Sequence, residues 1–446
     1  MKIEQKIKIM DLHIIGGGPA GLAAGYFAKQ KNLTFQILEG SSDLGGNCKT
    51  ISFGEFMYDT GAHRFHDKNK DVTAIIKTLM GDELLKVNSP SKIFWEKRLV
   101  NFPLEFSNIL KTLDKTTIIN IVLENIINIF SFNKNNMNFK ELSYKKYGKT
   151  LAELFLINYT EKLWGLDAEN LNNKIAGDRL KGLDLFSILK TLFIKNNIDQ
   201  KHLDGSFYYP KNGFGSIFNS LGDYVGKESI SLNSNVVEIH HKNNLIKNLI
   251  LDNNEDSQIK NLISTLPLNL LIKYLRPAAP KDILNISNNL KYRGLRLAII
   301  SLDLKSFSNN ASIYYPQSNI PFTRIYEPKN RSIKMAPNDK TCIVVEVPCQ
   351  PQDLIYNSSD DEFLDKIKYN LLKYTHIVES DIINSTSQKV PFAYPILDYE
   401  IEDKLNKLFN YLSVFTNLNL LGRSAEFKYL HTHNLFIHAN QLIKNI

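Results

Sequence analysis

Three glycines and one glutamate near the N-terminus have the types and spacing that bind a dinucleotide. Gly16, Gly18 and Gly21 form a G-x-G-x-x-G pattern, and Glu39 follows about 20 residues further on. Glycines at these positions permit a tight turn, let backbone N–H groups approach a pyrophosphate, and let a helix pack close to its strand. A carboxylate at Glu39 can accept hydrogen bonds from both hydroxyls of a ribose. A 2′-phosphate there would meet an uncompensated negative charge, so the pattern favours free ribose hydroxyls.

The elements around these glycines are those that a dinucleotide site requires. Residues 10–15 form a short apolar run, the helix-like stretch LAAGYFAKQK follows the glycines, and Thr34–Leu38 supplies a second strand that ends at Glu39. A second glycine pair, Gly45 and Gly46, is followed by Asn47. This pair resembles the extended fingerprint of FAD-binding proteins of the glutathione-reductase-like group. The resemblance favours FAD over NAD as the cofactor.

A histidine-containing segment follows, with the sequence YDTGAHRFHD at 58–67. His63 and His66 are three residues apart, but no further ligand motif accompanies them, so no metal site is expected. The segment resembles the histidine loop of UDP-galactopyranose mutases, in which G-x-H-x-F-H lies against the isoalloxazine ring. NYTEKLWGL at 158–166 and LGRSAEFKYL at 421–430 resemble two further segments of that family, in the same order.

The resemblance implies roles for individual residues beyond the glycine turns. It implies that the backbone near Val236 holds the adenine and that arginines bind the diphosphate of the substrate, since an arginine fork suits bidentate phosphate contact. The alternative for the two arginines, Arg179 and Arg293, is a surface charge or a structural ion pair. The alternative for Trp164 is a position in the core. The implied catalytic residues are His63, Arg179 and Arg293; the implied substrate contacts are Trp164, Tyr209 and Tyr429; the implied cofactor contacts include Gly61, Val236, Gly422 and Arg423.

Three functions are compatible with these residues. The resemblance implies pyranose–furanose isomerisation of a nucleotide sugar through N5 of reduced FAD, in cell-surface polysaccharide synthesis. The first alternative is an FAD-dependent oxidoreductase of the amine oxidase or protoporphyrinogen oxidase type, and the second is a flavin-binding protein without turnover. Two departures from the mutase pattern favour a divergent member: Glu346-Val347-Pro348 lacks the family tyrosine, and His431 and His433 stand where two carboxylates are usual.

The expected fold class is α/β, with a Rossmann-like FAD-binding domain, a helical insertion and a substrate domain containing an antiparallel sheet. We expect the FAD domain to be discontinuous, assembled from 8–95, 205–275 and 385–446. Residues 96–204 show helical spacing and would form a helical substrate or lid domain. Residues 276–384 would contain the sheet beneath the substrate.

Composition limits the partners and the setting of the protein. The 446 residues are 43% hydrophobic and 22% charged, which is typical of a folded protein, and the net charge of +8 is too sparse to indicate nucleic-acid binding. The charge balance suits a small-molecule substrate. Three cysteines suggest neither disulfides nor zinc, so a reducing, cytoplasmic setting is expected. Residues 118–132 predict a buried amphipathic helix, with a membrane-resting face as the alternative and no transmembrane segment. The sequence leaves the oligomeric state open.

Overall fold

A five-stranded parallel sheet forms the part of the molecule in which the glycine turns lie. The computed structural model describes residues 10–102, 112–130, 137–175 and 206–446. The strand order is β20-β13-β1-β2-β9, and every neighbouring pair is parallel. The strands are β1 (Leu12–Ile15), β2 (Phe35–Leu38), β9 (Ile230–Ser231), β13 (Leu262–Ser264) and β20 (Leu418–Leu420). Three distant stretches of chain therefore build one Rossmann-like sheet, which confirms the predicted fold class.

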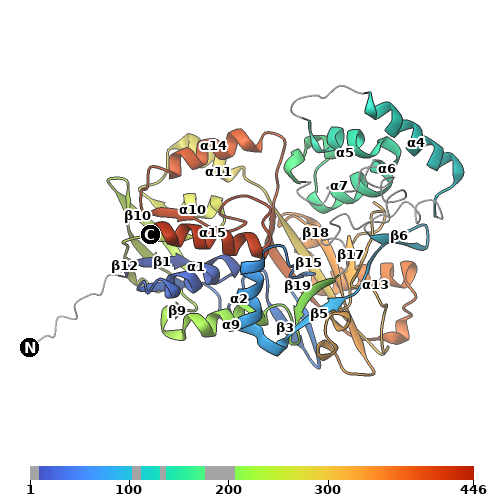
Figure 1. Cartoon of the computed structure of the whole chain (residues 1–446), viewed down its shortest axis with the longest axis horizontal. Helices are drawn as coiled ribbons and strands as arrows, with labels where there is room; N and C mark the ends of the chain where they lie inside the picture. Colours follow the sequence, from blue (N-terminus) through green and yellow to red (C-terminus); the bar gives the residue numbers. More distant parts are fainter. Residues whose placement is uncertain (1–9, 103–111, 131–136, 176–205) are drawn as a thin grey trace, which may run out of the picture.

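Helices cover this sheet, and a separate four-stranded sheet lies in the same half of the molecule. Helix α1 (Pro19–Gln30) follows β1 and contacts α15 (Thr432–Asn445) and α9 (Ser216–Val225). The smaller sheet has the order β12-β11-β10-β14. Its strands are β10 (Val236–Lys242), β11 (Leu245–Leu251), β12 (Asp256–Gln258) and β14 (Leu275–Arg276), and the nearby helices are α10 (Leu268–Tyr274), α11 (Lys281–Asn288) and α14 (Ile401–Leu412). All of these elements lie in one half of the molecule (Figure 1).

A seven-stranded sheet occupies the other half, with the order β19-β15-β18-β17-β16-β6-β7. All of its neighbouring pairs are antiparallel except β16–β6. Every residue of β15 and β18 is buried, so these two strands form its centre. The strands are β6 (Ser91–Trp95), β7 (Arg98–Phe102), β15 (Tyr292–Leu302), β16 (Ser312–Tyr314), β17 (Arg324–Tyr326), β18 (Thr341–Cys349) and β19 (Ile382–Pro395).

Strand pairing differs from the expected domain boundaries at two places. Residues 91–95 form β6, which pairs with β16, and residues 385–395 belong to β19, which pairs with β15. Both segments therefore lie in the seven-stranded sheet and not with the parallel sheet. The sequence did not predict this, because their pairing partners lie far along the chain. The division into three domains remains a prediction.

Two further sheets have only two strands each. Strand β3 (Thr50–Phe53) pairs with β4 (Phe56–Asp59), and β5 (Leu84–Asn88) pairs with β8 (Ser206–Pro210). Helix α2 (Lys70–Met80) lies between β4 and β5 in the sequence and contacts α9. The histidine loop, residues 60–67, follows β4 directly, so these pairs determine where it lies.

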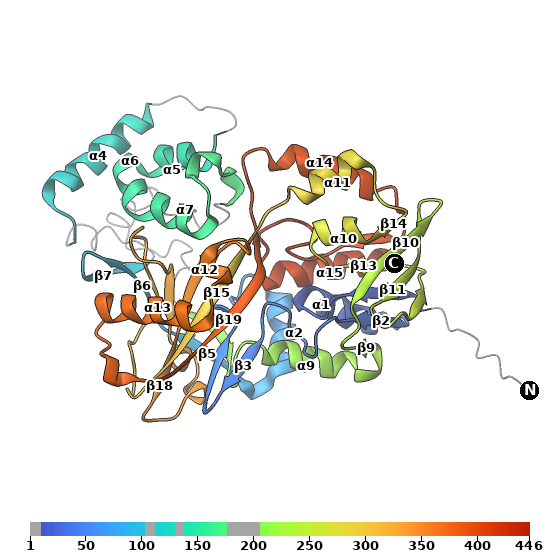
Figure 2. The same cartoon turned by 180° about the vertical axis from the view of Figure 1, so that it is seen from behind.

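A helical unit stands beside the seven-stranded sheet (Figure 2). It contains α4 (Lys115–Ile129), α5 (Phe139–Tyr147), α6 (Lys149–Ala152) and, after a π-helical turn at Glu153–Ile157, α7 (Asn158–Trp164). The predicted helix at 118–132 is present as α4, but the expected burial of its apolar residues is wrong for five of them. Ile119, Leu123, Ile126, Ile127 and Phe130 are exposed.

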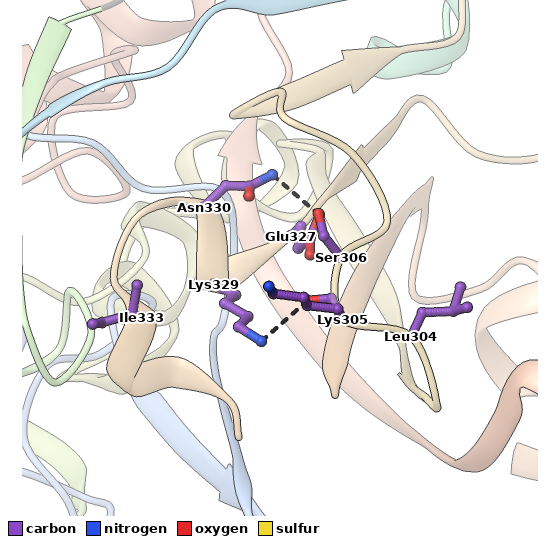
Figure 3. Close-up of a pocket in the computed structure, with 7 residues that line it drawn as sticks. All are labelled: Leu304, Lys305, Ser306, Glu327, Lys329, Asn330 and Ile333. Carbon is purple, nitrogen blue, oxygen red and sulfur yellow. Dashed lines mark hydrogen bonds between the residues drawn. The ribbon is translucent and has the colours of Figure 1, made fainter. Parts of the chain in front are cut away.

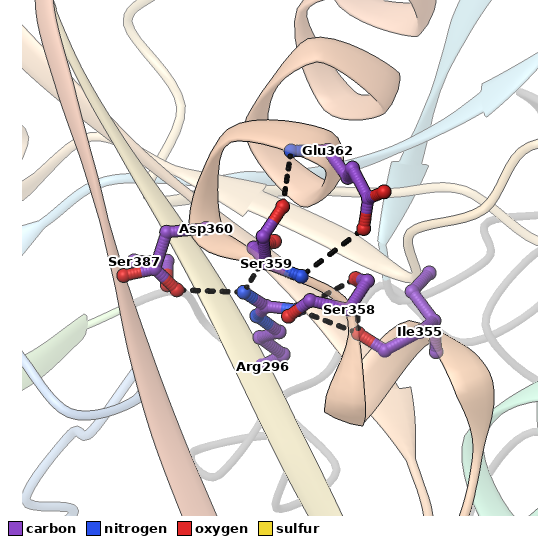
Figure 4. A network of polar contacts seen from close by, with 7 residues as sticks. All are labelled: Arg296, Ile355, Ser358, Ser359, Asp360, Glu362 and Ser387. Atoms are coloured by element: carbon purple, nitrogen blue, oxygen red, sulfur yellow. Dashed lines mark hydrogen bonds and ion pairs between the residues drawn. The ribbon is translucent and has the colours of Figure 1, made fainter.

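A buried arginine ties the centre of the seven-stranded sheet to the helices that cover it. Arg296 of β15 is fully buried and donates to the carbonyl oxygens of Ile355, Ser358 and Ser359, and its Nη2 lies 2.7 Å from Asp360 Oδ1 (Figure 4). These carbonyls lie at the end of α12 (Leu354–Asn357) and before α13 (Asp360–Tyr374). Arg296 therefore satisfies the backbone at the junction of the two helices.

Replacing this arginine is expected to destabilise the protein. Arg296→Met should lower the free energy of unfolding by about 3 kcal/mol, because three carbonyl groups at the helix junction lose a buried, charged donor. Arg276→Met is the matched control: Arg276 is 40% exposed and pairs with Glu238 at the surface, so the change should cost less than about 1 kcal/mol. Urea unfolding of both variants measures the difference, and equal losses would contradict the assigned role.

Candidate functional site

Two glycine turns face each other at the N-terminus of α1. Gly16 N–H donates to Leu38 O, and Gly45 N–H donates to Gly17 O at 2.9 Å. A Cβ on Gly18 would lie 3.6 Å from Gly46 Cα, so the backbones of the two turns lie close together with no side chain between them. Gly18 is the N-cap of α1 and makes no side-chain cap, which leaves the helix N-terminus available to an anion. The residues fit the pyrophosphate of a dinucleotide.

Two of the glycines are required by the packing of the turn. Gly16 has φ +101°, and a Cβ there would lie 2.1 Å from Thr265 Oγ1. A Cβ on Gly21 would lie 1.8 Å from Gly16 O, where α1 crosses the end of β1. Both distances are far below van der Waals contact, so the predicted close packing of helix on strand is present.

Glu39 lies beside this turn at the end of β2. Its Oε2 accepts a hydrogen bond from Gly17 N–H at 2.6 Å, and its Oε1 accepts from Ser41 N–H at 2.9 Å and from Ser41 Oγ at 2.7 Å. These bonds hold the carboxylate at the edge of the glycine turn, where a ribose would lie. Val236 is buried at the start of β10, and its contact with adenine remains a prediction.

The histidine loop lies against the second glycine turn. His63 Nε2 is 2.9 Å from Asn47 O, its Nδ1 is 3.8 Å from Cys48 Sγ, and its ring stacks on Phe214 with centroids 5.2 Å apart. Gly61 has φ +157°, which glycine adopts readily, and a Cβ on it would approach His63 Nε2 to 3.2 Å. The structure therefore brings His63, Gly61 and Asn47 to the same place as the glycine turns.

The environment of His63 keeps its imidazole neutral. Burial is the main cause of a pKa lowered to about 3, and the positive charges of Arg423, Arg331 and Arg324 contribute to this lowering. In a neutral ring with Nε2–H donating to Asn47 O, the Nδ1 atom is an acceptor, which the Cys48 thiol can satisfy. Protein groups thus engage both ring nitrogens. This geometry suits a role in holding the histidine loop in place better than a role in proton transfer.

An aromatic cluster lies where the C-terminal segment returns. Trp164 and Tyr429 have ring centroids 6.2 Å apart, and both contact Tyr394, which stacks on Tyr429 at 5.7 Å. Arg423 lies over the Tyr429 ring at 4.8 Å. Trp164 is buried and Tyr429 is partly exposed, so the tyrosine is the one of the two that a ligand could reach, and its substrate contact remains a prediction.

The same segment approaches the cofactor side. A Cβ on Gly422, which has φ +108°, would lie 3.0 Å from Ala20 Cβ at the start of α1. Arg423 donates to Leu430 O and Ala393 O, so its side chain ties the segment to the end of β19. Proximity to α1 supports the predicted cofactor contact of Gly422, whereas the phosphate contact of Arg423 remains a prediction.

Arg324 and Glu346, which sequence reasoning did not assign to the site, form an ion pair facing the histidine loop. They are opposite each other on β17 and β18, and Arg324 Nη2 lies 2.6 Å from Glu346 Oε2. Glu346 Oε1 accepts from Ala62 N–H at 2.9 Å. The Glu346 side chain is 3% exposed and that of Arg324 is 17% exposed, so the arginine is the member that a ligand can reach.

Comparisons with known proteins agree with this geometry. The family model for flavin containing amine oxidoreductases matches residues 19–389, which is most of the chain. The chain belongs to this family. A crystal structure of reduced UDP-galactopyranose mutase has the same fold, with a TM-score of 0.84 at 18% identity over 98% of this chain and 95% of that one. Putrescine oxidase with bound putrescine gives a TM-score of 0.66 at 12% identity, over 98% of each chain.

Two curated proteins match a short segment of this chain. Ferredoxin–NADP reductase 2 of Listeria welshimeri is 40% identical over 57 residues, and ferredoxin–NADP reductase of Streptococcus pyogenes is 40% identical over 58 residues. Each match spans 13% of this flavoprotein, and it spans 17% of the Listeria protein and 18% of the Streptococcus protein. Family membership and fold together establish a flavin-dependent enzyme of the amine oxidase family.

Three predicted site residues of this flavoprotein need comment. Tyr209 is a correction: it is fully buried, and its hydroxyl donates to Asp59 Oδ2 at 2.6 Å, so it makes a structural contact in place of the expected substrate contact. Arg293 is 7% exposed and donates to the carbonyls of Leu163 and Pro348. This geometry favours a structural connector, and its diphosphate contact remains a prediction. Arg179 lies outside the described residues.

A surface pocket of about 440 Å³ is lined by residues from 304–306 and 327–333, none of which is a predicted site residue (Figure 3). Lys329 Nζ there lies within hydrogen-bond distance of four backbone carbonyl oxygens, and Glu327 accepts from Phe307 N–H and Thr341 Oγ1. Their polar groups are thus used to hold loops together. Within the described ranges, no group of three or more His, Cys, Asp or Glu side chains could hold a metal ion.

The neutral state of His63 predicts how stability depends on pH. The pKa of an unfolded histidine is near 6.5, whereas that of folded His63 is about 3. As the pH falls from 6.5 towards 3, the unfolded chain binds a proton that the folded flavoprotein does not, so stability is lost in that window. His63→Gln should reduce the loss of unfolding free energy between about pH 7.5 and about pH 5. Urea unfolding at both pH values measures it, and an unchanged loss would contradict the assignment.

Proposed function

We propose that this flavoprotein binds FAD and, with the cofactor reduced, interconverts the pyranose and furanose forms of a nucleotide sugar in cell-surface polysaccharide synthesis. The observation that supports this most is the position of the histidine loop. His63 lies against Asn47 of the second glycine turn, in a chain whose fold matches reduced UDP-galactopyranose mutase over nearly its whole length. The proposal includes a cytoplasmic, reducing setting, and the three cysteines are free.

The cofactor would be held by the two glycine turns and the elements beside them. The N-terminus of α1 and the backbone at Gly16 and Gly18 would bind the pyrophosphate, and Glu39 would accept hydrogen bonds from the ribose. The backbone near Val236 would hold the adenine. When bound and reduced, the flavin supplies a nucleophilic N5 atom.

The remaining tasks of the reaction fall to side chains on the other side of the site. Arg324 would bind the diphosphate, with its guanidinium oriented by Glu346. Tyr429, supported by Trp164 and Tyr394, would form an aromatic wall that excludes water from the sugar. Neutral His63 would position its loop against the cofactor and would move no proton.

An FAD-dependent oxidoreductase is the second candidate. It is favoured by residues in which this chain departs from the mutase pattern, namely Val347 in place of the family tyrosine and the pair His431 and His433. The His431 and His433 rings stack 5.7 Å apart, and Tyr429 contacts His431 edge-on at 5.4 Å, so both histidines border the aromatic cluster. An imidazole pair there makes the local field less negative than two carboxylates would.

A substrate screen separates the two candidates. The FAD-loaded protein is reduced with dithionite without oxygen and incubated with UDP-galactose and related nucleotide sugars, and the ring form of the product is determined by NMR. The proposal predicts furanose product from at least one sugar. No product from any sugar, together with bleaching of the oxidised flavin by an amine or a polyene, would establish the oxidoreductase instead.

A further inference from the structure

The outward face of α4 is apolar. Ile119, Leu123, Ile126, Ile127 and Phe130 follow helical spacing on one side of the helix, and all five are exposed. Ile127 is 67% exposed and Phe130 is 79% exposed. We call these five residues the α4 stripe. A surface helix of a globular protein normally turns such a stripe towards the core.

Polar contacts on the opposite side fix this orientation of α4. Asn125 is 6% exposed, and its Nδ2 donates to Tyr147 O at 2.8 Å, while Asn128 Nδ2 donates to Tyr144 O at 2.7 Å. Glu124 accepts a hydrogen bond from Thr150 N–H at 2.7 Å. Rotating the helix to bury the stripe would break all of these bonds. The apolar face is therefore held outward by the packing of the helical unit itself.

A second apolar element lies at the same end of the molecule. Strand β7 exposes Leu99 and Phe102, and the tip of the β6–β7 hairpin exposes Lys97 and Arg98. Both views place this hairpin and α4 at one end (Figures 1 and 2). Lys115, at the start of α4, is also exposed. Apolar side chains and cations thus occur together on two separate elements.

We propose that the α4 stripe and the β6–β7 hairpin rest on an anionic lipid surface. Isoleucine, leucine and phenylalanine side chains insert at the boundary of headgroups and acyl chains, and Lys97, Arg98 and Lys115 would meet the anionic headgroups. The exposed acids nearby are Glu96 and Asp114, and Asp114 is engaged as the N-cap of α4.

The composition of the stripe favours lipid over a protein partner. Four of its five residues are isoleucine or leucine, and Phe130 is its only residue of the types enriched in protein interfaces. In the described part of the chain no helix is long and apolar enough to cross a membrane, so the contact would be peripheral.

The surface belongs to the same helical unit as part of the site. Helix α4 contacts α6, which continues through the π-helical turn into α7, and α7 ends at Trp164. A lipid surface at α4 would therefore hold the aromatic cluster at a fixed orientation to the membrane. The inference does not depend on which reaction the flavoprotein catalyses.

Vesicle flotation of the full-length, FAD-loaded protein tests the proposal. Vesicles of phosphatidylglycerol and phosphatidylcholine in equal parts should carry the protein to the top of the gradient, whereas pure phosphatidylcholine should bind it about ten-fold more weakly or not at all. The double variant Ile127→Ser/Phe130→Ser should lower the partition coefficient by at least about ten-fold. Lys97→Gln/Arg98→Gln should lower binding only to the anionic vesicles.

A matched control and a second measurement complete the test. Leu354 of α12 is 91% exposed and lies outside the stripe, so Leu354→Ser should leave flotation unchanged. Wild-type protein that remains unbound with both vesicle types would overturn the proposal. So would a wild-type dimer in light scattering that Ile127→Ser/Phe130→Ser converts to a monomer without any vesicle binding, since a second copy would then cover the stripe.

Discussion

Gly18→Val is expected to give a folded but colourless protein. Gly18 has φ −78° and ψ −175°, an extended conformation that any residue adopts, and a Cβ there would meet Gly46 Cα at an ordinary 3.6 Å. The fold can therefore accept a side chain. The valine would nevertheless stand between the two glycine turns, where the pyrophosphate of FAD is expected to lie, and should weaken FAD binding at least about 100-fold.

The measurement is the ratio of flavin to protein absorbance, together with a thermal melt of the apoprotein. Gly21→Ala is the matched control. Its Cβ would lie 1.8 Å from Gly16 O, so this variant should lose stability itself. A Gly18→Val protein that keeps its full complement of FAD would show that the phosphates do not pass between the turns.

Arg324→Gln is expected to weaken UDP binding to the FAD-loaded protein by roughly 30-fold or more, because losing one member of a charged hydrogen-bonded contact costs about 2–5 kcal/mol. Arg324 is the partly exposed member of its ion pair, and its charge lies close enough to lower the pKa of His63. UDP titration by calorimetry gives the affinity, and the flavin absorbance shows whether FAD is retained.

Glu346→Gln separates diphosphate binding from mere loss of the ion pair. It removes the same ion pair but keeps the cation, and its amide oxygen can still accept from Ala62 N–H. UDP affinity should be unchanged or higher in this variant, since Arg324 then has no competing carboxylate. Equal losses of UDP affinity in both variants would assign Arg324 a structural role.

The parts of the site that the sequence predicts well are those formed by neighbouring residues. Gly16, Gly18, Gly21 and Glu39 belong to one strand, turn, helix and strand, so their roles follow from local geometry. The histidine loop was predicted from its resemblance to a family segment, and the pairing of β3 with β4 returns the chain to the second glycine turn.

The parts that it predicts poorly depend on partners far along the chain. Tyr209 is buried because its hydroxyl finds Asp59, and Arg293 is held by the carbonyl of Leu163. Arg324 and Glu346 meet only because β17 and β18 pair in that register, which no spacing rule indicates.

The outward face of α4 shows a different limit. Periodicity locates the helix correctly, but it cannot say which side packs inward. Asn125 and Asn128 decide this through bonds to the carbonyls of Tyr147 and Tyr144, which a pattern of apolar residues does not reveal.

If the flavin acts without net electron transfer to or from the substrate, one flavin must support many turnovers, and counting products per flavin tests this. FAD-loaded protein is reduced with one equivalent of dithionite, freed of excess reductant without oxygen, and given the sugar nucleotide that the screen identifies. We expect many furanose products per flavin while the absorption spectrum remains that of the reduced cofactor. At most one product per flavin, with the oxidised spectrum appearing as product forms, would contradict it.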